Sequence, residues 1–248
     1  MRIAEKADKR GLESYAPLLA VFFVYSLGFT LVVPTLPKLL HDIAGDAGDA
    51  STYYGALTGL KYLLEFIVSP VFGALSDSVG RKRVLLLSLS CVAAELVIIS
   101  LFPNLLFIFL ATLIRGLGDQ TQTMIYAAAA DIAKQEQEPV TKSFGYLGGC
   151  FGLGCIIGPI IGSRVAAHSL PLCFMLSALM AVLALFLVVL FVKETNATPV
   201  PFSRAKANPF INLRVFFANS QLAALSVPFL LSHACTGMFL LRFCAELT

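Results

Sequence analysis

The chain has 248 residues, of which 58% are hydrophobic and 13% charged, with a mean hydropathy of +0.83 and a formal net charge of +3. Such a small share of polar residues cannot cover the core of a water-soluble chain of this length. The composition therefore excludes a soluble enzyme and predicts a chain that lies in membrane lipid. The positive charge does not indicate nucleic-acid binding, because the bases gather in loops on one side of the predicted spans.

Apolar runs of about 18 or more residues are long enough to cross a hydrocarbon core of about 30 Å. Seven runs meet this length and predict an all-α membrane protein. In chain order they are Tyr15–Leu40, Tyr53–Leu75, Val84–Phe102, Leu105–Ala130, Phe144–Val165, Leu170–Val192 and Leu222–Leu241. Residues 1–14 are polar and no small-residue cleavage site follows the first run, so we expect this run to be an uncleaved anchor.

The predicted spans divide the chain into three parts. We expect a six-helix bundle over residues 1–192, a cytoplasmic central loop rich in Pro and bases over 193–220, and a seventh span with a short tail over 221–248. Bases follow the second, fourth and sixth runs and precede the first, whereas the opposite loops carry few. The positive-inside rule therefore places the N-terminus in the cytoplasm, in either the plasma membrane or an endomembrane.

The usual signatures of enzymes and metal sites do not occur. The six cysteines fall inside or at the ends of the apolar runs without CxxC spacing, and the three histidines are scattered. This pattern predicts cysteines that pack as small hydrophobes, with no metal ion and no cofactor. There is also no phosphate-binding loop and no nucleophile elbow, so we do not expect an enzyme.

A glycine-bounded loop with clustered charges separates the second and third runs. Gly73 and Gly80 permit close backbone approach and a sharp reversal of the chain. Arg81 and Lys82, taken alone, are explained as positive-inside anchors. Asp77 is not, because an acid at this position gains nothing from that rule; it can instead pair with a base or with the N-terminus of a helix.

The loop from Gly73 to Lys82 resembles the signature loop of the major facilitator superfamily of transporters. The resemblance implies a conformational latch between two helical bundles, in which Asp77 and Arg81 are latch charges. The family usually carries a base where this chain has Ser78, so we expect a weaker or differently paired latch.

Three glycines recur at every fourth residue in the fifth run. Gly154, Gly158 and Gly162 line one stripe of a helix and let a neighbouring helix approach closely, and Pro159 favours a kink. Generic packing of small residues would also explain the stripe. The segment nevertheless resembles the fifth-helix motif of the drug/proton antiporter branch of the superfamily, which includes tetracycline exporters. Leu27-Gly28 and Pro34 to Pro37 near the end of the first run resemble the same branch.

Five ionisable residues lie within the predicted spans. Charges at this depth are costly and normally face the interior of the bundle, a partner or a water-filled cavity. The five are Lys61, Glu65, Glu95, Arg115 and Asp119. Lys61 with Glu65, and Arg115 with Asp119, are spaced as i, i+4 pairs, so each pair is either structural or functional.

Glu95 differs from the other four because no opposite charge lies within a turn of it on its own helix. A buried carboxyl without a partner favours its neutral form and changes charge state when water or a neighbour rearranges. Glu95 is therefore the best candidate for a proton carrier.

The family resemblance implies two six-helix halves with a solute site between them. This chain contains the first half and one further span, so the C-terminal half is incomplete. We expect a truncated half of a transporter that exports or exchanges a small organic solute, coupled to protons. The alternative is a non-transporting truncated isoform that acts as an interaction or regulatory protein, with a full-length or self partner in the lipid.

Overall fold

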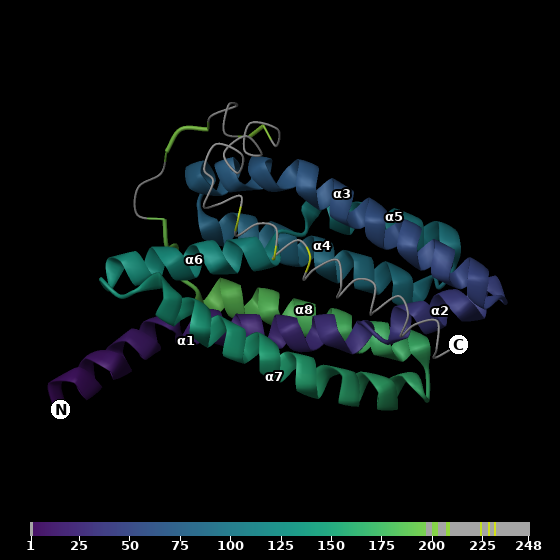
Figure 1. Cartoon of the computed structure of the whole chain (residues 1–248), viewed down its shortest axis with the longest axis horizontal. Helices are drawn as coiled ribbons and strands as arrows, with labels where there is room; N and C mark the ends of the chain where they lie inside the picture. The colour runs from purple at the N-terminus through teal and green to yellow at the C-terminus, as the bar shows by residue number, and fades with distance from the viewer. Residues whose placement is uncertain are drawn as a thin grey trace.

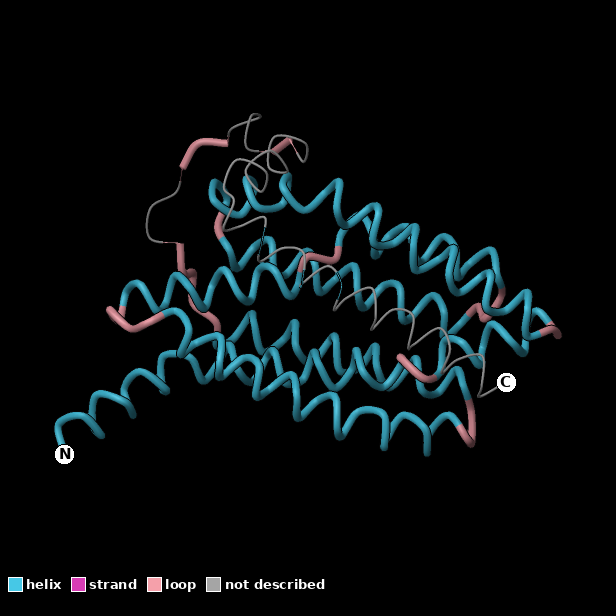
Figure 2. The backbone as a smooth tube through the Cα atoms, viewed as in Figure 1, coloured by secondary structure: helices cyan, strands magenta, loops and turns pink. Residues whose placement is uncertain are grey.

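The computed structural model describes residues 2–196, 200–202, 207, 208, 224, 228 and 231. Within these residues the chain forms eight α-helices that run along one long axis (Figures 1 and 2). The helices are α1 (Arg2–Val32), α2 (Thr35–Ala44), α3 (Ala47–Val79), α4 (Arg81–Leu101), α5 (Leu105–Gly118), α6 (Thr121–Gln135), α7 (Val140–Ala166) and α8 (Leu170–Phe191). An all-α membrane fold is thereby confirmed.

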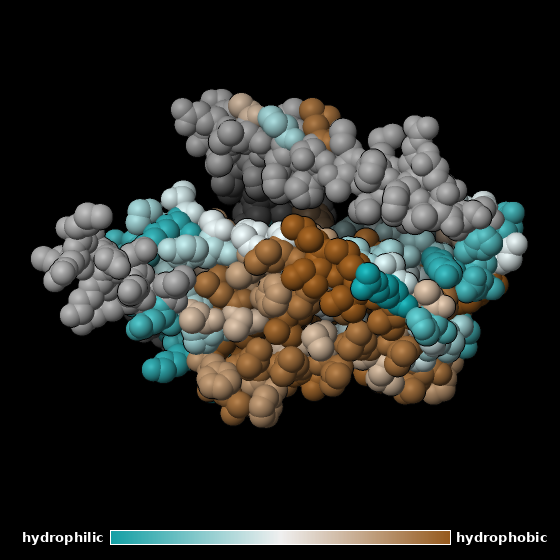
Figure 3. Space-filling model, turned by 90° about the horizontal axis from the view of Figure 1, so that it is seen from below, coloured by the Kyte–Doolittle hydropathy of each residue, from teal (hydrophilic) through white to brown (hydrophobic). Residues whose placement is uncertain are grey.

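The helices α1, α4 and α8 form the centre of the bundle. Helix α1 packs against α7 and α8, while α4 packs against α8 and α5. Phe22, Leu89 and Phe174, one from each central helix, are completely buried. Large apolar side chains are exposed on the outer helices and on the outward face of α8, and Figure 3 shows a broad hydrophobic band between hydrophilic ends. This band is the surface that a bilayer would cover.

Five helical segments are long and apolar enough to cross a membrane, by length and composition. They are Glu13–Ala44, Gly48–Val79, Arg81–Leu101, Val140–Ala166 and Leu170–Phe191. Most of the predicted central loop over 193–220 and of the seventh predicted span, Leu222–Leu241, lies outside the described residues.

Two of the predicted spans are interrupted. The first is broken between Val32 and Thr35, where Pro34 has no amide proton to donate and α2 then begins. The fourth was expected to be continuous over Leu105–Ala130, and that expectation is wrong. It consists of α5 and α6, of 14 and 15 residues, and both are shorter than a full span.

The break between α5 and α6 leaves backbone groups that need partners inside the bundle. The carboxylate of Asp119 accepts a hydrogen bond from the Thr121 amide at 3.1 Å. The backbone amide of Gln120 donates to the Ser88 hydroxyl on α4 at 3.2 Å. Polar side chains at the break thus replace the hydrogen bonds that a continuous helix would have made.

The glycine stripe on α7 lies directly against α1, as the sequence predicts. The Thr30 hydroxyl donates to the Gly154 carbonyl oxygen at 2.8 Å. A methyl group at Gly158 would overlap the Thr30 side chain, and one at Gly162 would overlap the backbone of Leu31. Pro159 lies inside α7, which continues past it. Only glycine therefore permits this spacing of α1 and α7.

Candidate functional site

A cavity of about 560 Å³ opens among α1, α3, α5 and α6. It lies where the interrupted helix pair α5–α6 faces α3. Its charged and amide-bearing lining residues are Lys61, Glu65, Arg115, Asp119, Gln120 and Gln122, and its aromatic lining residues are Tyr25, Phe29, Tyr62 and Phe66. Charged, amide and aromatic side chains therefore all line the cavity, and α3 contributes both charged and aromatic ones.

The two ion pairs predicted from i, i+4 spacing are both present. Lys61 Nζ lies 3.4 Å from Glu65 Oε1 on α3. Arg115 Nε lies 3.1 Å from Asp119 Oδ2 at the end of α5. The two pairs contribute to the same cavity, so α3 and α5 together supply its charged wall.

The expectation that Glu95 has no charged partner is wrong. Arg115 Nη1 donates to Glu95 Oε2 at 2.6 Å, across the contact between α5 and α4. The sequence could not indicate this pair, because the partner comes from the next helix and depends on how the two helices pack. Arg115 accordingly bridges two carboxylates, Glu95 behind it and Asp119 beside the cavity.

The cluster formed by Lys61, Glu65, Glu95, Arg115 and Asp119 contains three acids and two bases. With all five ionised, it carries one surplus negative charge. Asp119 also accepts a hydrogen bond from the backbone amide of Thr121 at 3.1 Å. Among the described residues Glu95 accepts a hydrogen bond from Arg115 alone. Among the described residues, Asp119 thus accepts hydrogen bonds from two donors and Glu95 from one.

Aromatic rings contact both bases of the cluster. The Lys61 ammonium lies 4.9 Å from the centre of the Tyr62 ring and 6.0 Å from that of Phe29. The Arg115 guanidinium lies 5.6 Å from the centre of the same Phe29 ring. The sequence analysis did not single out Phe29, since an aromatic residue in an apolar run gives no local sign of this role.

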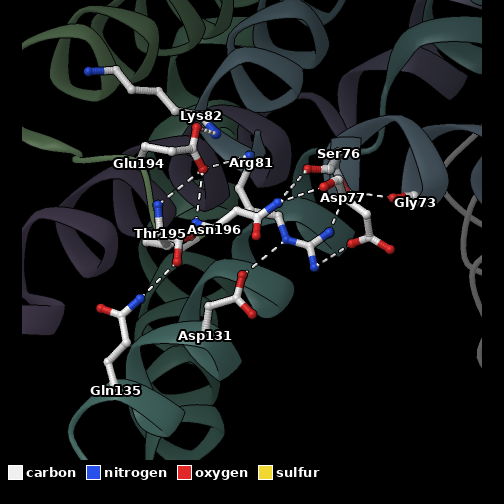
Figure 4. A network of polar contacts seen from close by, with 10 residues as sticks. All are labelled: Gly73, Ser76, Asp77, Arg81, Lys82, Asp131, Gln135, Glu194, Thr195 and Asn196. Carbon is white, nitrogen blue, oxygen red and sulfur yellow. Dashed lines mark hydrogen bonds and ion pairs between the residues drawn. The ribbon is translucent and has the colours of Figure 1, made fainter. Parts of the chain in front are cut away.

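The predicted latch charges meet at the C-terminal end of α3. Arg81 Nη2 lies 2.8 Å from Asp77 Oδ1, and Arg81 Nε lies 3.1 Å from Asp131 Oδ2 on α6 (Figure 4). Arg81 Nη1 also donates to the Ser76 hydroxyl. Asp131 was not predicted, because it lies 50 residues away in the chain. Asp131 provides a second acid for Arg81.

Glu194 binds the N-terminal end of α4 beside this latch. Its carboxylate accepts hydrogen bonds from the Arg81 amide at 2.8 Å and from the Lys82 amide at 3.2 Å. Gly80, with φ of 110°, makes the turn, and a side chain there would overlap Glu194. Gly73, in contrast, has open space around its Cα, so the expected close approach does not occur there.

The segment after α8 makes further contacts with the same loop, as Figure 4 shows. The Asn196 side-chain amide donates to the Asp77 carbonyl oxygen at 2.8 Å, and Gln135 on α6 donates to the Thr195 carbonyl oxygen at 2.8 Å. The Lys82 ammonium donates to the Val189 carbonyl oxygen at 3.0 Å. These bonds join α3, α4, α6 and the end of α8 at one end of the bundle.

Comparisons with known proteins agree with this architecture. The family model of the Major Facilitator Superfamily matches residues 18–244. The class H tetracycline resistance protein of Pasteurella multocida is 30% identical over 209 residues, which cover 82% of this chain and 51% of that protein. The class G protein of Vibrio anguillarum is 32% identical over 205 residues, with the same two coverages. The chain thus spans about half the length of the curated relatives that it matches.

A solved structure with a similar fold is that of the human organic anion transporter MFSD10 (TETRAN). The TM-score is 0.70 at 21% sequence identity, over 87% of this chain and 59% of that one. At this level of identity the similarity concerns the fold alone. Because the family model covers most of the sequence and the helices pack in the same way, the chain belongs to the Major Facilitator Superfamily.

Proposed function

We propose that the chain forms the first half of a transporter that exchanges a small organic solute for protons. The observation that carries the proposal is the surplus carboxylate of the intramembrane cluster, in which Arg115 is shared by Glu95 and Asp119. A charge imbalance in a low-dielectric site is relieved by binding either a proton or a positively charged group. Occupation by one therefore disfavours occupation by the other, which is the requirement for exchange.

In this mechanism the proton binds at Glu95. Protonation weakens the bond from Arg115 to Glu95 and leaves the guanidinium paired mainly with Asp119. Because Arg115 and Asp119 line the cavity and Glu95 does not, the change of charge is transmitted to the solute through Arg115. Glu65 and Lys61 complete the polar wall and set its charge.

The loop around Asp77 and Arg81 acts as the latch in this proposal. Arg81 connects α3 to α6 through Asp77 and Asp131, so a movement of α6 changes a contact at the latch. Since α6 also begins at the break beside Asp119, one helix of 15 residues joins the charge cluster to the latch. The second half of the transporter would close against this face.

Tetracycline is the first solute to test, because the relatives are named as tetracycline resistance proteins. We expect everted membrane vesicles that contain the longest product of the gene to accumulate tetracycline when the interior is acidified. Collapse of the pH gradient with nigericin should abolish the uptake. Uptake that persists without a pH gradient would contradict proton exchange.

A second candidate function is that of an interaction or regulatory protein in the membrane. In this alternative the chain does not transport but binds a full-length or second copy in the membrane. Co-purification of differently tagged copies, without any uptake by the vesicles, would favour it. Uptake by the gene's longest product with the cluster intact would favour the transporter.

A further inference from the structure

The Lys61 ammonium occupies a site with the chemistry of a receptor for organic cations. The Tyr62 and Phe29 rings lie 4.9 and 6.0 Å from Nζ, and the Glu65 carboxylate lies 3.4 Å from it. Rings within about 6 Å of a cation attract it through their negative faces, and such rings are typical of quaternary-ammonium sites. We call Phe29, Tyr62 and Glu65 the cation cage.

Lys61 is held more loosely than the other base of the cluster. Among the described residues, Arg115 has two carboxylate partners, at 2.6 and 3.1 Å, whereas Lys61 has one at 3.4 Å. Lysine also carries a compact charge at the end of a flexible four-carbon stem, which can swing away without a backbone change. Lys61 can therefore leave the cage while Arg115 stays in place.

The cage opens on the cavity that the proposed function assigns to the solute. Phe29, Lys61, Tyr62 and Glu65 all line this space of about 560 Å³, with Phe66 beside them. A solute that carries an ammonium group next to an aromatic ring would place the ammonium group in the cage. Its ring would lie against the other aromatic residues that line the cavity.

We infer that the cage is the binding subsite for a singly charged organic ammonium group, and that Lys61 is its tethered competitor. Lys61 then determines specificity, because a solute binds only when its cation outcompetes the lysine. This inference rests on the proposed function for its biological meaning. The binding itself requires only the residues of this chain.

The test is equilibrium binding of benzyltrimethylammonium to the purified 248-residue chain in lipid nanodiscs. Lys61→Met should tighten the apparent Kd by about tenfold, the gain expected when a competitor that fills the site about nine-tenths of the time is removed. Lys61→Arg keeps a cation in place and should produce no such gain. Lys38→Met is the matched control, because it removes an equivalent charge from an exposed position on α2.

Two further variants separate the cage from a general effect of charge. Adding Phe29→Leu to Lys61→Met should remove most of the gain, and Glu65→Gln alone should weaken binding. The chain contains no tryptophan, so Tyr62→Trp places a single indole in the cage. The emission of that indole should change saturably with benzyltrimethylammonium and not with benzyl alcohol. This reporter also provides a measurement if Lys61→Met fails to fold.

Equal affinity of Lys61→Met and Lys38→Met, or an indole emission that does not respond, would overturn the inference. The outcome is independent of transport. Tighter binding without proton-driven uptake would reject the proposed function and leave the subsite in place. Uptake with no gain in Lys61→Met would reject the subsite alone.

Discussion

Arg115 holds Glu95 and Asp119 at once, and its removal should affect the whole cluster. Both carboxylates would then lie buried without their cation, a situation that costs about 3–5 kcal/mol. We expect Arg115→Met to lower the thermal unfolding temperature of the chain in detergent by many degrees. Arg164→Met, at an exposed base on α7, should leave it unchanged. Equal unfolding temperatures for both variants would contradict the bridging role.

Part of this cluster could be predicted from sequence and part could not. The pairs Lys61–Glu65 and Arg115–Asp119 lie one turn apart on single helices, so their spacing predicts them. The bond from Arg115 to Glu95 depends on the packing of α5 against α4, which no local pattern encodes. The same limit applies to Asp131 on α6 and to Glu194 in the segment after α8, which are both distant from the latch in sequence.

Helices α1 and α7 approach closely only because α7 carries glycines. A methyl group at Gly158 would overlap the Thr30 side chain, and overpacking of this kind costs about 1–3 kcal/mol. We expect Gly158→Ala to destabilise the bundle in thermal unfolding. Gly152→Ala, on the same helix, meets open space and should be neutral or slightly stabilising. Similar losses at the two positions would rule out the packing explanation.

The latch joins α3 to α6 through Arg81, so its two acids have separable effects. Asp77→Asn leaves Arg81 paired with Asp131, and the local fold should persist. We expect the gene's longest product with this change to reach the membrane normally and to lose proton-driven uptake, because a contact specific to one conformation is removed. Asp49→Asn, at an exposed acid at the start of α3, is the control. Unchanged uptake by Asp77→Asn at matched expression would exclude the latch role.

The interruptions of the spans differ in how visible they are in sequence. Pro34 lacks an amide proton, which is a local sign of a helix break, although the predicted first span continued to Leu40. The break between α5 and α6 contains no proline, and the only local sign is the polar pair Asp119-Gln120 inside an apolar run. Partners on other elements, such as Ser88 on α4, stabilise this break. No local pattern shows these partners, so the sequence predicts one long helix at this position.

The predicted orientation of the whole bundle rests on the distribution of its bases and can be tested directly. In a cysteine-free background, Ser51→Cys at the start of α3 should react with an impermeant thiol reagent added to intact cells. Arg83→Cys, in the exposed first turn of α4, should react only after permeabilisation. Both positions are exposed, so a difference in labelling reports the side of the membrane. Labelling of Arg83→Cys from outside would reverse the assignment.

Coupling through Glu95 is the central claim, and the movement of protons during solute flux tests it most directly. Proteoliposomes with the longest product of the gene are loaded with a pH-sensitive dye, and a tetracycline gradient is imposed at equal pH. We predict that the wild-type protein moves protons against the direction of the solute, whereas Glu95→Gln moves solute with little or no proton movement. Proton movement in Glu95→Gln equal to that of the wild type, per solute transported, would contradict the account.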